Sequence, residues 1–464
     1  PSVDSDQGYA AEFVGKVPFQ SVDHAGPSMD KNMLAGEVDT LGKRLLVPEG
    51  KVVILLNTPF TYADHPLCPL HLMSVNTLKL ISFLKLKGNR VHFINMRSDE
   101  TYAWKDMPAG REGSATVSMR IMGKSKAHLL QRLRALNETP DEIWISCIFT
   151  FDHEVVGEMV KACREVFSGA KILLGGDSVR CAPELAAAMH VDAYCGRVEE
   201  ADQAVPDLSA IDNKEYGLFQ LAIGCPNRCA FCLAGMDPPR AIDTDVVISY
   251  MKEYYAAHHP SVFWNWDPNV LVFGKAFGAF LDKYAASGIR AKLRFGKGFQ
   301  PNLLTESLFL SMAGTASVGA SLPIEAADSA TIQRYRKPYT IISSVKILAM
   351  ALRHNFDLRS SQCTFVLGYP DDSFPSIFRA YLTILLFGGR PTPFPVFLFP
   401  HSADYERYRE ILQDKDLARL HGQLWPLVHS QDVPKYQNLL KFLLLPTFEQ
   451  AGQNLSLLTP DLRA

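Results

Sequence analysis

The sequence predicts an α/β protein in which two parallel sheets follow one another and a mainly helical extension ends the chain. Short, continuously apolar runs, typical of strands buried on both faces, alternate with longer helical segments. The run from Val52 to Leu56 is the first of these strands. The alternation begins near Lys51 and starts again near residue 218, after a short polar stretch. Strands that alternate with helices predict parallel sheets covered by helices.

The first series predicts a doubly wound, Rossmann-like sheet. Its strands are expected at 52–56, 91–94, 143–146, 172–174 and 191–194, with helices near 70–87, 126–136 and 153–167. Gly88 ends the first helix, and a Gly-Gly pair ends the fourth strand. Ligands of such sheets bind beyond the carboxyl ends of the strands.

The second series predicts an open or partial (β/α)6 barrel. Its strands are expected at 218–223, 262–266, 290–295, 316–322, 360–367 and 393–399. The chemistry of a barrel lies at the carboxyl ends of its strands. The rest of the chain, with Trp425 and the apolar run 439–445, is expected to form helices that pack on the barrel mouth.

These patterns divide the chain into five segments. We expect an arm at 1–48, the first sheet domain at 49–204, a linker at 205–217, the barrel at 218–399 and the extension at 400–464. The length of 464 residues, 47% hydrophobic and 21% charged, is typical of a globular protein of several domains.

Charge and cysteine usage narrow the partners and the compartment. The formal net charge of −2 predicts no broad attraction to nucleic acid or to an anionic membrane. No apolar run reaches the roughly 20 residues that a membrane helix needs, and residues 1–20 lack the pattern of a secretory leader. Nine cysteines without a small-scaffold pattern predict a reducing cytoplasm.

Three cysteines, Cys225, Cys229 and Cys232, form a C-x3-C-x2-C pattern directly after the first barrel strand. Zinc sites usually combine two separated pairs of ligands, and no second C-x2-C pair exists in the chain. Ferredoxin clusters use four cysteines. Three thiolates on one loop therefore favour an iron–sulfur cluster with one iron left open. The alternative is three unrelated core or redox thiols.

With these cysteines in place, the chain resembles the radical S-adenosylmethionine (SAM) enzymes. Phe231 lies between the last two cysteines, as an aromatic residue does in that family. The segments Leu322–Glu325 and Ile332–Lys337 are similar to the part of that family near the methionyl group of SAM, and Phe365–Pro370 is similar to its Gly-aromatic-Pro strand end near the adenine.

The resemblance implies a cofactor set and a reaction. A four-iron four-sulfur cluster on the three cysteines would bind SAM through its open iron, and one electron would cleave a carbon–sulfur bond of SAM. A water-poor cavity would protect the radical. The residues that we expect to hold SAM are Phe231, Asn265, Asp267, Glu325, Arg336, Gly368 and Tyr369. Asp267 can equally be a turn residue, and Arg336 can equally be a solvated helix end.

The amino-terminal half resembles the cobalamin-binding domain found in a large branch of that family. The matching residues are Ser146-Cys147-Ile148 and Gly175-Gly176, and Thr58 follows the first strand of the same sheet. The resemblance implies that Thr58, Ser146, Gly175 and Gly176 contact cobalamin. The D-x-H-x-x-G motif that supplies a histidine to cobalt is absent from the sequence. A Gly-Gly pair after a strand is also a common tight turn.

The resemblance leaves two main functions open. One is a cobalamin-dependent methyltransferase that acts on an unactivated carbon, or on phosphorus, of a small organic molecule. The other is a radical SAM rearrangement, cyclisation or carbon–carbon bond formation that does not use cobalamin for methyl transfer. Methylthiolation of transfer RNA would require three further cysteines at another spacing, which the sequence lacks. An iron–sulfur sensor would leave the downstream barrel segments unexplained.

The partners implied are a small-molecule substrate and an electron donor such as flavodoxin or ferredoxin. No residue is assigned as a substrate base or hydrogen donor. Tyr335, Tyr369 and Cys363 are candidates by their position near predicted strand ends alone.

Overall fold

A computed structural model describes residues 47–63, 73–315, 319–354, 356–358, 361–412 and 416–444. Residues 1–46 of the predicted arm lie outside these ranges, as does most of the segment 439–464. Within the described ranges, no helix is long and apolar enough to cross a membrane. The predicted domain boundaries stay a prediction.

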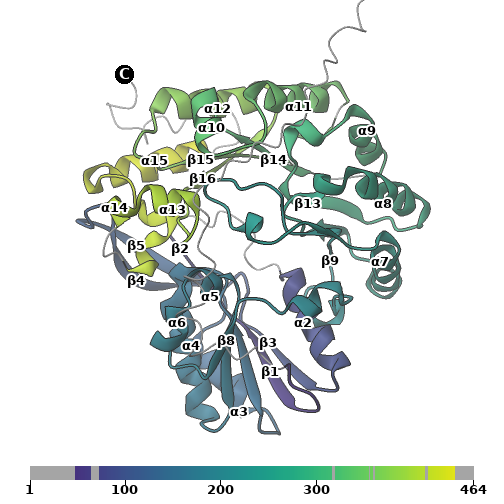
Figure 1. The fold of residues 1–464 in the computed structure, drawn as a ribbon, viewed down its shortest axis with the longest axis vertical. Coiled ribbons are helices and arrows are strands. Elements are labelled where there is room, and N and C mark those ends of the chain that lie inside the picture. The colour runs from purple at the N-terminus through teal and green to yellow at the C-terminus, as the bar shows by residue number, and fades with distance from the viewer. Residues whose placement is uncertain are drawn as a thin grey trace, which may run out of the picture. The chain divides into compact units, whose positions relative to one another are not determined.

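The first sheet is parallel, as predicted, with the strand order β3-β1-β6-β7-β8. The helix α2 lies on one face and α3 and α4 lie on the other (Figure 1). The strand order changes direction between β1 and β6, so the switch point of the sheet lies between these two strands. The elements are β1 (Val52–Asn57), α2 (Val75–Leu86), β3 (Arg90–Asn95), α3 (Lys126–Arg134), β6 (Glu142–Ser146), α4 (His153–Val166), β7 (Lys171–Gly175), α5 (Asp177–Cys181), α6 (Glu184–Ala188) and β8 (Ala193–Cys195).

A three-stranded antiparallel sheet was not predicted. Its order is β2-β5-β4, and its strands are β2 (Phe60–Ala63), β4 (Thr101–Ala109) and β5 (Ala115–Met122). In β5, Val117, Met119 and Ile121 are buried and alternate with more exposed residues. This period of two is the sequence signal that identifies a half-buried strand.

The second sheet has six parallel strands in sequential order, from β9 at one edge to β16 at the other. Among the described residues no ladder joins β9 to β16, which agrees with the predicted open barrel. Its elements are β9 (Tyr216–Phe219), α7 (Thr244–His258), β12 (Val262–Asn265), α8 (Gly274–Ala286), β13 (Lys292–Gly298), α9 (Glu306–Gly314), β14 (Ala320–Glu325), α10 (Ser329–Arg334), α11 (Ile341–Arg353), β15 (Gln362–Leu367), α12 (Phe374–Leu386) and β16 (Arg390–Pro395).

The predicted strands of this sheet have other bounds in the structure. The strand expected at 218–223 is β9 followed by β10 (Ala222–Ile223), which pairs antiparallel with β11 (Arg240–Ala241). The strand expected at 290–295 is β13 and ends at Gly298. Of the strand expected at 316–322, residues 316–318 lie outside the described ranges and β14 runs from Ala320 to Glu325, while the strand expected at 393–399 is β16, which begins at Arg390 and ends at Pro395. In the first case the reason is a hydrogen bond, because the N–H of Leu221 donates to a side chain, the Asp267 carboxylate (2.8 Å), and not to a strand.

The carboxyl-terminal segment is helical, as predicted. Buried residues of this segment also bond to the antiparallel sheet: the N–H of Gly110 donates to Leu424 O (2.8 Å), and the N–H of Ala63 donates to Gln423 Oε1 (2.7 Å). The helices are α13 (Ala403–Arg407), α14 (Arg409–Leu412) and α15 (Val433–Leu443), with short 3-10 turns at Leu417–Leu420, Gly422–Leu424 and Ser430–Asp432. The remaining 3-10 turns are Thr150–Asp152, Glu199–Gln203, Leu208–Ala210, Ala234–Met236, Val270–Phe273 and Pro301–Leu303.

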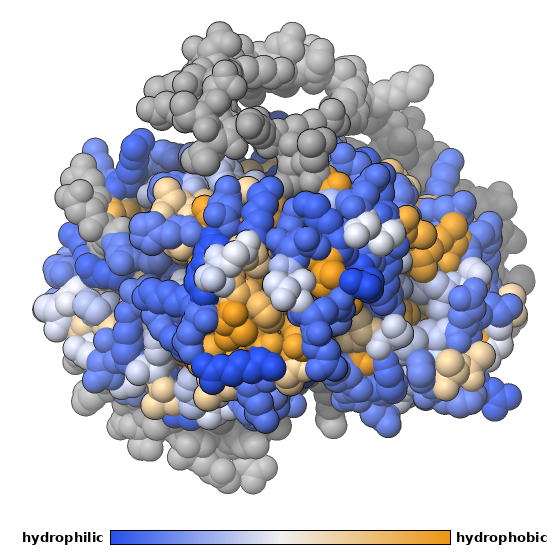
Figure 2. Space-filling model, turned by 90° about the horizontal axis from the view of Figure 1, so that it is seen from below, coloured by the Kyte–Doolittle hydropathy of each residue, from blue (hydrophilic) through white to orange (hydrophobic). Residues whose placement is uncertain are grey.

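One face of the surface is shown in Figure 2. Hydrophilic side chains cover most of this face, and apolar side chains gather near its middle. Leu86, at the end of α2, is 77% exposed and is the most exposed of the large apolar residues among the described ranges. A mixed surface of this kind is usual for folded chains.

Candidate functional site

The three cysteines lie on a loop that starts where β10 ends and folds back on itself. Gly224 has φ of 70°, and a Cβ atom there would lie 2.5 Å from the carbonyl oxygens of Asp237 and Pro238. Only glycine fits this turn. The N–H of Cys225 donates to Asp237 O (3.3 Å), and the N–H of Cys232 donates to Cys229 O (3.1 Å). The sequence therefore forces a compact loop that carries all three thiols.

The three thiols are free and differ in exposure. Cys225 is buried, Cys229 is half-buried and Cys232 is exposed. Burial raises the pKa of Cys225, and it raises the pKa of Cys229 to about 11. Without a metal these two thiols stay protonated, and a metal would have to displace their protons. The N–H of Ala234 points at Cys232 Sγ (3.4 Å), a contact that suits a charged sulfur. This donor set fits an iron–sulfur cluster.

Neighbouring elements fix the middle of the loop. The N–H of Ala230 donates to Tyr335 O (3.0 Å), and the O of Ala230 accepts from the N–H of Asp404 (2.9 Å). The Phe231 ring meets the Tyr335 ring edge to face, with centroids 5.6 Å apart. The loop is therefore held between the end of α10 and the start of α13.

Glu325 and Lys337 form a buried ion pair beside the loop. Glu325 Oε1 lies 2.6 Å from Lys337 Nζ, and their side chains are 6% and 9% exposed. Lys337 Nζ also lies 4.7 Å from the centre of the Phe231 ring. Burial opposes the charge of Lys337, but Glu325, Tyr339 and Cys229 raise its pKa above the ordinary value. From the sequence, a solvated helix end and a carboxylate clamp are equally open for Lys337, and its burial beside Glu325 excludes the solvated helix end.

The backbone at Glu325 is unusual. Its φ is 63°, a left-handed conformation that few residues other than glycine adopt. Such a conformation persists only where the surrounding structure imposes it, and it is common at functional sites. Glu325 is also the last residue of β14, at the carboxyl edge of the barrel. The structure thus brings Phe231 and Glu325 to the cysteine loop.

Asn265 and Asp267 lie at the carboxyl end of β12, and each is 1% exposed. Asp267 accepts from the N–H of Leu221, the bond that separates β9 from β10, and burial raises its pKa to about 7. Asn265 Oδ1 accepts from the N–H of Asp267 (3.1 Å). Asn265 Nδ2 has no partner among the described residues and remains free to donate to a ligand. Asp267 has a structural role, because it shapes the start of the cysteine loop.

Gly368 and Tyr369 follow β15. Gly368 has φ of 104°, and its N–H donates to Asp372 Oδ2 (2.5 Å). The Tyr369 hydroxyl donates to Asp404 Oδ2 (2.6 Å), and both residues are buried. The hydroxyl of Tyr369 is thus already used within the protein, whereas its backbone lies at the strand end.

Arg336 was expected to bind SAM as a carboxylate clamp. The structure places it after the end of α10, exposed and with φ of 54°. No hydrogen bond or ion pair joins its guanidinium to a described residue of the cysteine loop. Its assignment stays a prediction.

An ion-pair network next to the cysteine loop was not predicted in detail. Asp237, whose carbonyl accepts from Cys225, pairs with Arg180 Nη2 (3.0 Å) and with Arg197 Nη1 (2.5 Å). Arg197 also pairs with Asp202 (2.8 Å). Arg180 and Arg197 follow strands of the first sheet, so this network ties the first sheet to the cysteine loop.

The carboxyl edge of the first sheet holds the other four predicted residues. Asn57, Ser146 and Gly175 are in register on neighbouring strands. The Thr58 hydroxyl donates to Ser146 O (2.6 Å), a bond that crosses the switch point of the sheet. The structure therefore brings Thr58, Ser146 and the two glycines to one edge.

The two glycines of this edge have a reason within the chain itself. Gly176 has φ of 110°, and a Cβ atom there would lie 2.2 Å from Cys147 O. A Cβ atom at Gly175 would lie 3.3 Å from Cys195 O. Both contacts are with the backbone. Gly176 is thus required by the turn that was the alternative to a ligand contact, whereas a side chain at Gly175 would need only a small shift of its neighbour.

Aromatic side chains join this edge to the segment after β16. The Phe149 ring lies 6.2 Å from the Phe399 ring, and the Phe151 ring lies 5.4 Å from the Phe397 ring. The imidazole of His421 contacts Phe151 (4.6 Å), and burial lowers the pKa of His421 to about 4. The neutral imidazole belongs to an apolar cluster.

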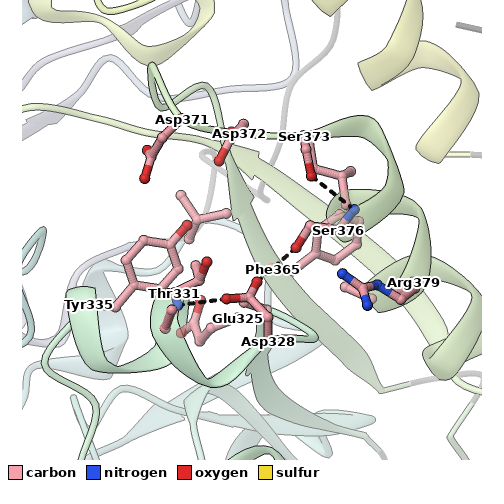
Figure 3. A pocket seen from close by; sticks show the side chains of 15 residues that line it. Glu325, Asp328, Thr331, Tyr335, Phe365, Asp371, Asp372, Ser373, Ser376 and Arg379 are labelled. Carbon is pink, nitrogen blue, oxygen red and sulfur yellow. Dashed lines mark hydrogen bonds between the residues drawn. The ribbon is translucent and has the colours of Figure 1, made fainter.

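A cavity of about 300 Å³ lies between α10, β15 and α12 (Figure 3). Glu325 and Tyr335 form part of its wall, so it adjoins the residues that hold the cysteine loop. Carboxylates of Asp328, Asp371 and Asp372 also line it.

No family model and no curated protein matches the sequence. Two solved structures of the cobalamin-dependent S-adenosylmethionine radical enzyme OxsB are similar to it, one with aqua-cobalamin and S-adenosylmethionine bound and one with aqua-cobalamin bound. For each, the TM-score is 0.51 at 12% identity, over 81% of this chain and 57% of OxsB. The chain thus matches little more than half of the length of OxsB. Over the matched part, the chain and OxsB have a similar fold.

Proposed function

We propose that the protein is a radical SAM enzyme that cleaves S-adenosylmethionine reductively at a four-iron four-sulfur cluster. The observation that carries the proposal is the loop of three free cysteines, shaped by Gly224, at the carboxyl edge of an open barrel. The fold shared with OxsB supports it. A cluster bound by the three cysteines would supply the electron for cleavage and an open iron for SAM.

The residues around the loop have separate tasks in this proposal. Cys225, Cys229 and Cys232 hold the cluster. Lys337 neutralises Glu325 and covers the face of Phe231, so it holds both side chains in place and excludes water from the loop. Asn265 Nδ2, Gly368, Tyr369 and Arg336 are the further groups that we assign to SAM.

We further propose cobalamin as the second cofactor and methyl transfer to carbon or phosphorus of a small organic substrate as the reaction. When bound, cobalamin would carry the methyl group. Thr58 and Ser146 at the switch point, with Gly175 and Gly176 beside them, are the residues that would contact it. An electron donor such as flavodoxin or ferredoxin and a cytoplasmic location belong to the same proposal.

The alternative is a radical SAM rearrangement, cyclisation or carbon–carbon bond formation without methyl transfer by cobalamin. A specific observation favours it: Gly175 and Gly176 fit against the backbone of the chain itself, and Phe149 and Phe151 contact Phe397 and Phe399 at the same edge.

One spectrum separates the two reactions. The protein is purified anaerobically with added cobalamin and with iron and sulfide, and excess ligand is removed. Methyl transfer predicts corrinoid absorbance that stays with the protein, together with the broad cluster band. A cluster band without retained corrinoid would contradict cobalamin binding and leave the alternative. Thr58→Val serves as the site variant, because it removes the hydroxyl that bonds to Ser146 O.

A further inference from the structure

A second, smaller cavity adjoins the one in Figure 3. Its volume is about 150 Å³, and it lies between β14, α11 and α12. Ala326 and Arg379 line both cavities, so the two share a wall. Their combined volume lies within the range of about 300–1,000 Å³ that is usual for small-molecule sites. None of the three cysteines lines either cavity.

Most charges in the larger cavity are already neutralised. Glu325 pairs with Lys337, and Asp371 and Asp372 pair with Arg334. Two charged groups that line the cavity, Asp328 and Arg379, have no ion pair among the described residues.

Asp328 is a carboxylate without an ion pair in the described ranges. Its Oδ1 accepts from the N–H of Thr331 (2.7 Å), and its Oδ2 accepts from the Ser376 hydroxyl (2.7 Å). Burial opposes the charge, but these two donors hold the pKa of Asp328 below its usual value. Each oxygen keeps a lone pair for a further donor. Figure 3 shows this carboxylate between α10 and α12.

Arg379 carries a positive charge, opposite to that of Asp328. It projects from α12 toward the cavity (Figure 3), and its guanidinium has no hydrogen bond or ion pair with any described residue. Its distance from Asp328 exceeds that of an ion pair, so the two charges leave space between them. A cation at the junction of two cavities is suited to a carboxylate.

The smaller cavity is largely apolar, and its polar lining residues are Arg379, Thr383 and Ser344. Ile324, Ile341, Val345 and Leu348 line it. Ser344 also lines it, is 1% exposed, and has an Oγ without a hydrogen-bond partner among the described residues. A buried hydroxyl without a partner is costly and rare. A ligand that reaches this cavity with a hydrogen-bond acceptor would satisfy the hydroxyl.

We propose that the two cavities form one binding site for a free α-amino acid whose apolar side chain contains a weak acceptor, as methionine does. The ammonium group lies at Asp328, the carboxylate at Arg379, and the thioether in the smaller cavity near Ser344. The thioether sulfur is a weak acceptor. This site adjoins the cysteine loop through Glu325 and Tyr335 but includes none of its cysteines, and the inference does not rest on the proposed function.

Calorimetric titration of the full chain with L-methionine tests the proposal. Three comparison ligands each remove one group: L-norleucine lacks the sulfur, 3-(methylthio)propylamine lacks the carboxylate, and 4-(methylthio)butanoate lacks the ammonium. We expect methionine to bind. The propylamine and the butanoate should bind at least about tenfold more weakly than methionine, and norleucine should bind about two- to fivefold more weakly.

Variants assign these differences to residues. Arg379→Gln should weaken methionine binding about tenfold, while Arg353→Gln, an exposed arginine of α11 outside both cavities, should leave it unchanged. Ser344→Ala should abolish the preference for methionine over norleucine. Cys229→Ala should bind methionine as the unaltered chain does, which separates this site from the cluster.

Three results would overturn the proposal. They are the absence of methionine binding at millimolar concentrations, equal binding by Arg379→Gln, and binding of the amine as tight as that of methionine. Circular dichroism of Arg379→Gln checks that the variant is folded, and the exposed position of Arg379 predicts that it is.

Discussion

Two carboxyl strand edges in this chain carry the predicted cofactor residues, and they differ in what their polar groups contact. At the barrel edge, three thiols form no disulfide, and the amide nitrogen of Asn265 has no hydrogen-bond partner among the described residues. At the edge of the first sheet, Thr58 bonds to Ser146, and the two glycines fit against backbone oxygens. Groups that the protein leaves unused are the stronger sign of a ligand, because burying them otherwise costs free energy.

The largest effect in this comparison should come from the ion pair at the barrel edge. Lys337→Met leaves Glu325 buried without a partner, which should lower the free energy of unfolding by about 3–5 kcal/mol. Urea unfolding measures it. Lys346→Met, an exposed lysine of α11, is the matched control and should change little. Adding Glu325→Gln to Lys337→Met should recover part of the loss, and no recovery would show that the pair is not what stabilises this edge.

The next effect is a pH dependence at the edge of the first sheet. Asp152 is 2% exposed, accepts from Thr61 N (2.9 Å) and Thr61 Oγ1 (2.6 Å), and burial raises its pKa to about 7. A carboxyl with a raised pKa in the folded state binds a proton that the unfolded chain releases near pH 4. The stability of the protein should therefore fall as the pH rises from 4 to 7, by up to about 4 kcal/mol.

Asp152→Asn removes this dependence and keeps an oxygen for Thr61. Unfolding curves at several pH values should show that the free energy of unfolding of Asp152→Asn, relative to that of the unaltered chain, increases from pH 4 to pH 7. His421, with its pKa lowered to about 4, acts in the opposite direction, since its contribution is lost as the pH falls below about 6.5. An Asp152→Asn difference that stays constant over this range would contradict the raised pKa.

Alanine at the two turn glycines compares the edges directly. Gly176→Ala and Gly224→Ala each place a Cβ atom within 2.5 Å of backbone oxygen in a left-handed conformation, so each should cost about 2–3 kcal/mol. Gly224→Ala should also lower the iron content, whereas Gly176→Ala should not. If Gly176→Ala lost iron and Gly224→Ala kept it, the roles of the two edges would be reversed.

The smallest effect belongs to the network that joins the first sheet to the cysteine loop. Arg180→Gln removes one of the two arginines that pair with Asp237, while Arg197 remains. The Arg180 and Asp237 side chains are each 19% exposed, and Arg197 still neutralises Asp237 in the variant, so the loss should be about 1 kcal/mol. Thermal unfolding measures this loss, and Arg111→Gln, a half-exposed arginine in the turn between β4 and β5, serves as the comparison. A decrease of more than about 3 kcal/mol in the free energy of unfolding would show that this ion pair behaves as a fully buried one.

The sequence was sufficient for the parts of this comparison that local patterns determine. The cysteine spacing, the buried parallel strands and Gly224 are visible as residue types at fixed intervals. The antiparallel sheet was missed, although Val117, Met119 and Ile121 alternate as a half-buried strand requires. β4 gave no such signal, since it contains exposed charges and Pro108.

Contacts between distant segments were beyond the sequence. The sequence alone does not distinguish a solvated Lys337 from a buried one. The fold places Lys337 against Glu325 and Phe231. From the sequence alone, Tyr369 is expected to contact a ligand. In the structure its hydroxyl donates to Asp404, which lies 35 residues later in the chain. The left-handed backbone of Glu325 likewise depends on its surroundings and not on its residue type.

The central claim is that the cysteine loop holds a cluster that cleaves SAM, and one assay tests it most directly. The unaltered chain, Cys229→Ala and Cys195→Ala are reconstituted with iron and sulfide, reduced with dithionite and given SAM, and 5′-deoxyadenosine is measured by chromatography. Cys195, half-buried in the first sheet, is the matched control. We expect the unaltered chain and Cys195→Ala to form 5′-deoxyadenosine and Cys229→Ala to form none. Formation at a normal rate by Cys229→Ala would contradict the claim.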